Sequence, residues 1–309
     1  MSEDTNIEGI DRITYCTDGT PENWLVARQF FVDWGLTPLK DDAHELLFET
    51  LNGSQVRILP PHSPELADCP AMESGATLRE VVWGVAGGAA IPDSCVDPHG
   101  LRHRFQPSIK RAITLQGSPS NTWGQVVRVN SPSPVYEHAT PVEVGHVVLF
   151  SDNLSEAVKF YQGLGFTISD QYPNRGVFLR CSKTGGHHDV FLLQVPGKPK
   201  GLNHVAFTVR DIHEVFGGGL AMSRAGWKTQ LGPGRHPISS AYFWYFECPV
   251  GGLIEYNADE DHLTEHWQAR EFEPSPTRFA EWAIDGGLDG HTRRQPNAAA
   301  GGKFLTEKR

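Results

Sequence analysis

The chain has 309 residues, more than one hydrophobic core usually serves, so its length predicts two domains of about 150 residues each. It carries 37 acidic against 27 basic side chains, a net charge of −10, and the Lys and Arg residues are scattered along it. This balance argues against nucleic acid or an anionic membrane as the main partner and favours a small molecule.

The five cysteines show no CxxC spacing, so the sequence predicts neither a disulfide framework nor a structural zinc site. No apolar run approaches the length of a membrane span, and the first residues, "MSEDTNIEGIDR", are too polar and acidic for a signal peptide. We therefore expect a cytoplasmic protein with no membrane partner.

We also expect copies of the chain to form a homo-oligomer.

The first half contains a predicted helix and the strands that follow it. Thr20 and Pro21 suit the cap and first turn of a helix that ends within "FFVDWGLT", residues 30–37. "HELLFETL" and "SQVRILPP" then predict two strands, and "TLREVVWGVA" predicts the strand that begins a second unit. The Pro-rich stretch "NSPSPVYEHATP", residues 130–141, is typical of a linker between the two halves.

The second half shows the same order more clearly. "VEVGHVVLF" is rich in β-branched residues and predicts a buried strand, and Asp152 and Asn153 suit the cap of the helix "LSEAVKFYQGLGF". "GVFLRCS" and "DVFLLQV" predict two strands, after which "LNHVAFTV" begins the pattern again with a helix from Asp211. The last two predicted strands are "AYFWYFEC" and "GGLIEYN".

A weak internal repeat supports this division, because "FFVDWGLT" aligns without gaps against "FYQGLGFT", residues 160–167. We therefore predict an α+β fold of four β-α-β-β-β modules, paired into two domains that each form an open, curved, mixed sheet. The predicted boundaries are 1–137 for the N-terminal domain, 138–268 for the C-terminal domain and 269–309 for a tail. We expect this tail to be partly helical, at "SPTRFAEWAI", and partly disordered.

Two histidines and a glutamate occupy related places in the predicted strands of the second half. His146 and His204 each open a β-branched strand in consecutive modules, and Glu255 lies on the last strand, beside Leu253 and Ile254. A carboxylate in such apolar company has a large desolvation cost unless a cation neutralises it. Two imidazoles and one carboxylate form the donor set typical of non-haem Fe(II) oxygen chemistry. The plainer alternative is that both histidines are hydrogen-bonded core residues and Glu255 is a charge at a strand edge.

A longer motif surrounds Glu255, with nine residues from its histidine to its tyrosine and ten from the tyrosine to the glutamate. It consists of Gly234, His236, Tyr245, Pro249, Gly251 and Glu255. In this frame the sequence resembles the C-terminal signature of the type I extradiol ring-cleavage dioxygenases of the vicinal oxygen chelate superfamily. "GPGRH" is most similar to the homoprotocatechuate branch. Trp244 and Cys248 depart from the signature, and both departures bear on the substrate class more than on the reaction type.

This resemblance implies a vicinal oxygen chelate, or glyoxalase-like, fold and extradiol (meta) cleavage of a catechol-type diol by O2, giving a ring-opened semialdehyde in aromatic catabolism. His146, His204 and Glu255 would hold Fe(II), or Mn(II) as in some members of the family. His188, in "GGHHDVFLLQ", would be the acid/base histidine. His187 is the weaker candidate because it should face the other side of the strand.

The resemblance also implies a set of substrate contacts. His236 and Tyr245 would line the pocket, hydrogen-bond the substrate oxygens and take part in catalysis. Arg235, Arg180 and Phe178 are further candidates for substrate binding, and Arg235 in "GPGRH" is a candidate to recognise an anionic ring substituent. An exposed arginine in a Gly-Pro loop is the alternative for Arg235.

Three other hypotheses remain open at this point. Metal-dependent isomerases and transferases of the glyoxalase type share the fold, and so do members that bind a small ligand without turning it over. "HLTEH", residues 262–266, matches the H-x-x-E-H pattern of inverted zinc peptidases, or is a solvated segment at the mouth of the site. In the first half, Arg12 and Glu80 stand roughly where His146 and His204 map, so we expect a structural duplicate without metal ligands.

Overall fold

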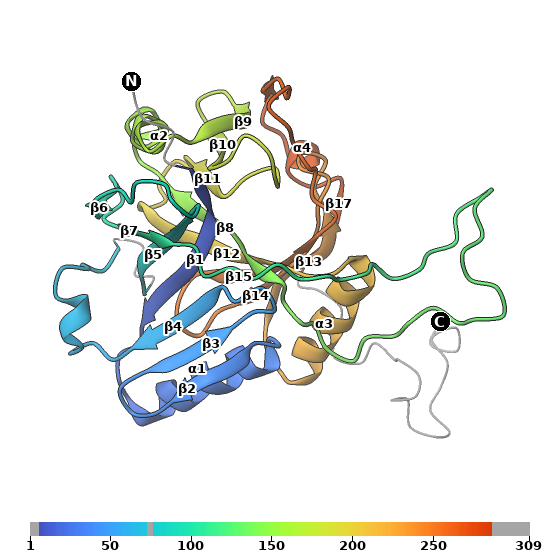
Figure 1. Cartoon of the computed structure of the whole chain (residues 1–309), viewed down its shortest axis with the longest axis horizontal. Helices are drawn as coiled ribbons and strands as arrows, with labels where there is room; N and C mark the ends of the chain where they lie inside the picture. The colour runs from blue at the N-terminus through green and yellow to red at the C-terminus, as the bar shows by residue number, and fades with distance from the viewer. Residues whose placement is uncertain (1–5, 73–76, 286–309) are drawn as a thin grey trace.

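The computed structural model describes residues 6–72 and 77–285, and its strands form two mixed sheets (Figure 1). The first sheet has seven strands in the order β2-β3-β4-β1-β5-β7-β6. The second has ten, in the order β16-β9-β10-β11-β8-β12-β15-β14-β13-β17. The predicted α+β class with a mixed sheet in each half is confirmed.

The first half holds one long helix. Its elements are β1 (Ile7–Cys16), α1 (Pro21–Asp33), β2 (Thr37–Asp41), β3 (Leu46–Glu49), β4 (Gln55–Leu59), the 3-10 turn η1 (Pro64–Leu66), β5 (Leu78–Val85), β6 (Cys95–Val96) and β7 (Arg102–Pro107). Helix α1 begins where the sequence predicts, because the Thr20 side chain accepts a hydrogen bond from the backbone N–H of Asn23. The sequence did not predict strand β2, because "TPLKD" lacks the alternating apolar residues of a half-buried strand. The structure shows β2 as an exposed edge strand.

The prediction of four complete modules is wrong for the second module of the first half. Strand β5 is followed by turns, the short strand β6 and then β7, which pairs parallel to β5 with no helix among residues 86–101. The reason is local, because "AGGAAIPDS", residues 86–94, combines glycine and proline and has no apolar repeat at helical spacing.

The second half contains both of its predicted modules. Its elements are β8 (Glu143–Phe150), α2 (Leu154–Gly163), β9 (Thr167–Tyr172), β10 (Gly176–Arg180), β11 (Val190–Leu193), β12 (Gly201–Thr208), α3 (Ile212–Arg224), β13 (Thr229–Arg235), β14 (Tyr242–Glu247), β15 (Leu253–Ala258), β16 (Arg270–Glu271), α4 (Pro276–Phe279) and β17 (Trp282–Asp285). The side chains of Asn153 and Asp211 cap α2 and α3 by accepting backbone N–H groups. Among the described residues, none of the helices is long and apolar enough to cross a membrane.

The described part of the predicted C-terminal tail contains a helix within "SPTRFAEWAI", as expected, but also two short strands. Helix α4 has only four residues, after which the chain forms β17 and pairs with β13. Strand β16 pairs with β9. Strands β16 and β17 therefore join the second sheet, while the predicted disordered end lies outside the described residues.

One hydrophobic core joins the two halves, because α1 and α2 both contact the opposite half. Trp34, at the end of α1, stacks on Tyr256 of β15 with ring centroids 3.6 Å apart. Tyr161 of α2 packs against His103 of β7, and its hydroxyl donates to the Asp97 carboxylate at 2.9 Å. The halves are therefore not independently packed units.

A buried polar cluster lies at this junction. The Asp97 carboxylate is 3.0 Å from His99 Nδ1 and 3.4 Å from His103 Nε2, and Trp83 Nε1–H donates to His103 Nδ1. Burial alone raises the pKa of Asp97, but the hydrogen bonds from His103 and His99 outweigh it and hold that pKa well below its usual range. The junction therefore keeps a buried negative charge that its neighbours satisfy.

Candidate active site

Three adjacent strands of the second sheet carry the two histidines and the glutamate. His146 lies on β8, His204 on β12 and Glu255 on β15, and the sheet order is β8-β12-β15. His146 and Glu255 each stand opposite Ala206 of β12, and His204 precedes Ala206 by two residues on the same face. The small Ala206 side chain leaves room for the three larger ones to converge.

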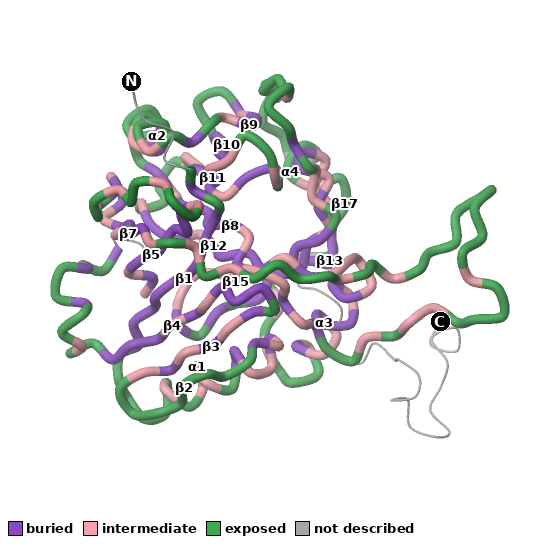
Figure 2. Tube along the Cα trace, in the orientation of Figure 1, coloured by how far each residue is buried: buried purple, intermediate pink, exposed green. Residues whose placement is uncertain are grey.

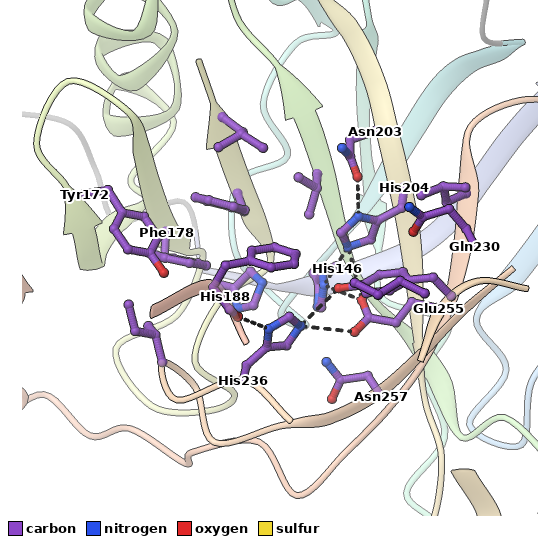
Figure 3. Close-up of a pocket in the computed structure, with 18 of the residues that line it drawn as sticks. His146, Tyr172, Phe178, His188, Asn203, His204, Gln230, His236, Glu255 and Asn257 are labelled. Carbon is purple, nitrogen blue, oxygen red and sulfur yellow. Dashed lines mark hydrogen bonds and ion pairs between the residues drawn. The ribbon is translucent and has the colours of Figure 1, made fainter. Parts of the chain in front are cut away.

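The convergence is tight and buried. His204 Nε2 is 3.1 Å and His146 Nε2 is 3.3 Å from Glu255 Oε2, and the two Nε2 atoms are 3.4 Å apart (Figure 3). The exposed fractions are 3% for His146, 7% for His204 and 0% for Glu255. The structure thus brings together all three residues that the sequence nominated as metal ligands.

The donor set fits a divalent cation. Both carboxylate oxygens of Glu255 are buried without a hydrogen-bond partner, which is costly for an ionised group unless something else neutralises it. Donors about 2.1 Å from an octahedral ion lie about 3 Å apart when adjacent, close to the separations found here. His204 Nδ1 lies 2.6 Å from Asn203 Oδ1, an acceptor that keeps the proton on Nδ1 and leaves the Nε2 lone pair for a metal.

Electrostatics at the centre favour a neutral His204 beside an ionised Glu255. Burial lowers the pKa of His204 despite the nearby Glu255. Burial by itself would raise the pKa of Glu255, but the contacts with His146 and His204 reverse the direction and lower it. These are the protonation states that metal binding requires.

A second candidate triad shares one residue with the first. His146, His188 and Glu260 also bring ligand atoms within 4.8 Å of one another. In this set Glu260 is only partly buried, and His188 Nδ1 is already close to two other groups. The triad of His146, His204 and Glu255 is fully buried and has Asn203 behind it, so it is the better metal site.

His188 sits at the edge of the centre, just before β11, and its ring is tilted by 36° against that of His146 at a centroid distance of 4.1 Å. Its Nδ1 lies 3.0 Å from Glu260 Oε1 and 3.2 Å from His187 Nδ1. His187 Nε2 in turn lies 2.9 Å from the Asp170 carboxylate. Both contacts engage Nδ1, so Nε2 is the ring nitrogen of His188 left for a ligand in the cavity.

Burial is the main cause that lowers the pKa of His188 well below its usual value, with His146 next. The ring is therefore neutral near pH 7 and able to accept a proton. His187 is completely buried behind it and does not line the cavity, as the sequence predicted.

His236 and Tyr245 form a pair on the opposite wall. Tyr245 is directly opposite Glu255 in the β14–β15 register, and its hydroxyl lies 3.0 Å from His236 Nε2. His236 Nδ1 lies 2.7 Å from the carbonyl oxygen of Phe279, which accepts the Nδ1 proton and makes Nε2 the acceptor for Tyr245. Burial raises the pKa of Tyr245 well above its usual value, so the phenol stays a donor.

A cavity of about 210 Å³ opens beside the triad. Apart from the triad and Asn203, most side chains around it are apolar or aromatic: Val148, Tyr172, Phe178, Phe191, Leu193, Leu231, Ile238, Leu253 and Phe279. The other polar side chains that line it are His188, His236, Tyr245, Gln230, Asn257 and Arg278. Phe178, a predicted substrate contact, is among them. A more open hollow of about 440 Å³ adjoins this cavity and shares Tyr172, Phe191, Leu193 and Phe279 with it.

Two predicted substrate contacts do not reach the cavity. Arg235 forms an ion pair with Glu281, and Arg180 is buried with its guanidinium bound to Ser169 Oγ and the Ile168 carbonyl. Neither side chain lines the cavity, so these two assignments are corrected. Both residues brace neighbouring segments: Arg235 holds the segment just before β17, and Arg180 holds the beginning of β9.

The sequence did not predict several residues of the site. Asn203 and Glu260 carried a usable signal, since each is a polar residue close to a nominated ligand in the chain. Asp170, Arg278 and Phe279 carried none, because they reach the site only through the pairing of β9 and the packing of α4.

The competing motifs gain no structural support. Residues 262–266 are not helical, so the two histidines of "HLTEH" lack the geometry of a zinc peptidase, and His266 is exposed. In the first half, the guanidinium of Arg12 lies 3.8 Å from the Glu80 carboxylate, and the guanidinium of Arg102 lies 2.6 Å from it. Glu80 is therefore engaged in ion pairs with arginines. Of the described residues, only those in the second half form clusters that could hold a metal.

Comparison with known proteins gives the same picture. Residues 143–256 match the family model described as the Glyoxalase/Bleomycin resistance protein/Dioxygenase superfamily. Metapyrocatechase 2 from Cupriavidus necator is 31% identical over 218 residues, an alignment that covers 69% of this chain and 66% of that relative, just under two thirds of its length.

Solved structures resemble the whole fold. The Mn(II)-bound glyoxalase from Novosphingobium aromaticivorans has a TM-score of 0.69 at 21% identity, covering 91% of this chain and 93% of its own. Homoprotocatechuate 2,3-dioxygenase from Arthrobacter globiformis has a TM-score of 0.66 at 16% identity, covering 90% and 88%. At these identities the likeness concerns the fold, and the predicted vicinal oxygen chelate, or glyoxalase-like, fold is confirmed.

Proposed function

Because residues 143–256 match the glyoxalase/bleomycin resistance protein/dioxygenase model and metapyrocatechase 2 is 31% identical over 218 residues, we propose that the chain is an extradiol dioxygenase that opens a catechol-type ring beside its diol with O2, giving a semialdehyde. We assign Fe(II) as its metal, with Mn(II) as the alternative, and His146, His204 and Glu255 as the ligands. The observation that carries this proposal is the buried carboxylate of Glu255, unpartnered and facing two imidazole Nε2 atoms.

The metal would supply Lewis acidity toward the diol and a binding place for O2. The remaining chemistry belongs to the chain. Asn203 orients His204 for ligation, and the apolar wall of Phe178, Phe191 and Leu193 excludes water and holds the ring. Positioning both reactants against one centre converts a three-body encounter into a local one.

Two groups handle protons. His188, neutral and with Nε2 available, takes a proton from a catechol hydroxyl as the substrate binds and returns it later in the cycle. Tyr245, kept protonated by its burial, donates its one O–H to His236 Nε2, which leaves its hydroxyl oxygen to accept a hydrogen bond from a catechol hydroxyl. An isomerase of the glyoxalase type needs neither group in this arrangement, which favours ring cleavage over that alternative.

The cavity favours a catechol with an apolar substituent. The wall is mostly aromatic and aliphatic, and the adjoining hollow extends past Leu193 and Phe279. Of the described lysines and arginines, Arg278 alone lines the cavity, and its guanidinium lies over the Phe272 ring. We therefore expect alkyl- or aryl-substituted catechols to be turned over with a higher kcat/KM than carboxylated ones. The opposite order, abolished by Arg278→Ala, would contradict this.

The five cysteines are all free, which suits a reducing compartment, and we propose a cytoplasmic location and a homo-oligomeric state.

The function is tested by loading the metal-free protein with Fe(II) without oxygen, then adding catechols and O2. We expect one O2 consumed per catechol and a yellow ring-opened product. Absence of oxygen uptake with both Fe(II) and Mn(II), together with isomerisation of a glutathione hemithioacetal, would establish the glyoxalase-type alternative instead.

A further inference from the structure

A long arm leaves the body after β7 and returns before β8. Figure 1 shows it projecting beyond α3, and Figure 2 shows it as mostly exposed. Its base is fixed to the start of α3, where the Ser118 N–H donates to the Asp211 carboxylate at 2.6 Å and Arg210 donates to the Gln116 carbonyl at 3.0 Å. We call residues 119–135 the arm.

The tip of the arm has a defined shape. Asn121 Oδ1 accepts the N–H groups of Val127 and Arg128, and Thr122 and Gln125 exchange two backbone hydrogen bonds at 3.0 Å. Arg128 Nε donates to the Pro119 carbonyl across the base of this hairpin. These bonds fix the shape of the hairpin, and Ser120 Oγ also lies 3.3 Å from His213 Nε2 of α3, so the arm is preorganised rather than a loose linker.

The arm presents apolar side chains to solvent. Trp123 is 105% exposed and Val129 70%. Val126, Val127 and Val135 are more than half exposed as well. From residue 112 to residue 136 the only charged side chain is Arg128. A stretch of this length on an ordinary surface carries several charges, so its composition is that of an interface.

We propose that the arm is the contact surface for a second copy of this chain, used reciprocally about a two-fold axis. Burying a tryptophan removes about 150–250 Å² from water, and a valine about 60–120 Å². With these exposures one arm offers roughly 300–550 Å² of apolar area. A two-fold contact uses two arms and the two surfaces that cover them, roughly 1,200–2,200 Å² in total, which is what a stable interface buries.

Other occupants fit the arm less well. A single arm on an unrelated protein would bury about half of that area, near or below the minimum for a specific interface. An anionic membrane or nucleic acid is disfavoured by the net charge of −10 and by the lone arginine of the arm, whose guanidinium is already engaged. The proposal is independent of the function proposed above, because no arm residue lines the cavity.

The test is the mass of the full-length protein at micromolar concentration, measured by sedimentation and light scattering. We expect the wild type at an even multiple of 34.2 kDa and the double variant Trp123→Asp, Val127→Asp at half the wild-type mass. The matched control is Leu25→Asp, which places the same charge on α1 at a residue that is 63% exposed and far from the arm in sequence. The control should keep the wild-type mass.

Thermal unfolding and oxygen uptake per chain check that the double variant is folded, since the arm contributes nothing to the core. A wild type of 34.2 kDa, or a folded double variant that keeps the wild-type mass, would overturn the proposal. So would a monomer that binds neutral phosphatidylcholine vesicles through Trp123, because the arm would then serve a lipid surface.

Discussion

Replacement of His188 by phenylalanine separates metal binding from proton transfer at the proposed site. The new ring should occupy the same space, since His188 already packs between aromatic rings at centroid distances of 4.1 Å to His146 and 5.1 Å to Phe178. None of the three nominated ligands changes. Iron content should therefore stay at the wild-type level, while the proton acceptor is lost.

The magnitude follows from the role. A positioned general acid or base contributes about 10²- to 10⁴-fold in rate, or about 2.7–5.4 kcal/mol in the activation barrier. We expect kcat for oxygen uptake at saturating catechol to fall within that range, with KM within a few-fold of wild type. His266→Phe, at an exposed histidine, is the control and should change neither quantity. A fully iron-loaded His188→Phe enzyme within about three-fold of wild-type kcat would refute the assignment.

Three further predictions test the surroundings of the site and the core. Asn203→Ala removes the acceptor that orients His204 and should weaken Fe(II) affinity about 10- to 100-fold, measured by anaerobic titration. Glu260→Leu removes the carboxylate 3.0 Å from His188 Nδ1 and should lower kcat about ten-fold with little change in KM and shift the pH profile of kcat, whereas Glu260→Gln, which keeps an acceptor oxygen, should restore most of the rate. Asp97 has a lowered pKa in the folded state, so its charge stabilises the protein above about pH 4, the unfolded value, and that contribution is lost as the pH falls further. Asp97→Asn should therefore lower the free energy of unfolding by about 1–3 kcal/mol at pH 7, and urea titrations should show the difference shrinking below about pH 4.

The elements that the sequence predicted well are those whose signal is local. The strands carrying His146, His204 and Glu255 are β-branched or aromatic runs with turn residues at their ends, and the helices α2 and α3 have clear caps. Because the side-chain period of a strand is two, the positions of these ligands on their strands also predicted which residues could face one another. The three nominated ligands therefore converge in the structure.

The predictions that were wrong concern features that are not set by the local sequence signal alone. The missing helix after β5 was expected from the symmetry of the repeat, which local glycine and proline content overrides. Arg235 and Arg180 were candidates for substrate binding, but each finds a partner outside the cavity, in Glu281 and Ser169. Strand β17 depends on pairing with β13, a long-range contact that no local pattern encodes.

The central claim is that one buried cation is held jointly by His146, His204 and Glu255. Anaerobic Fe(II) titration of the metal-free wild type and of Glu255→Gln, followed by metal analysis after gel filtration, tests it most directly. We expect one tightly held iron per wild-type chain and less than about a tenth of that in the variant, whose amide is a far weaker ligand than a carboxylate. A folded variant that retains a full equivalent of iron would contradict the claim.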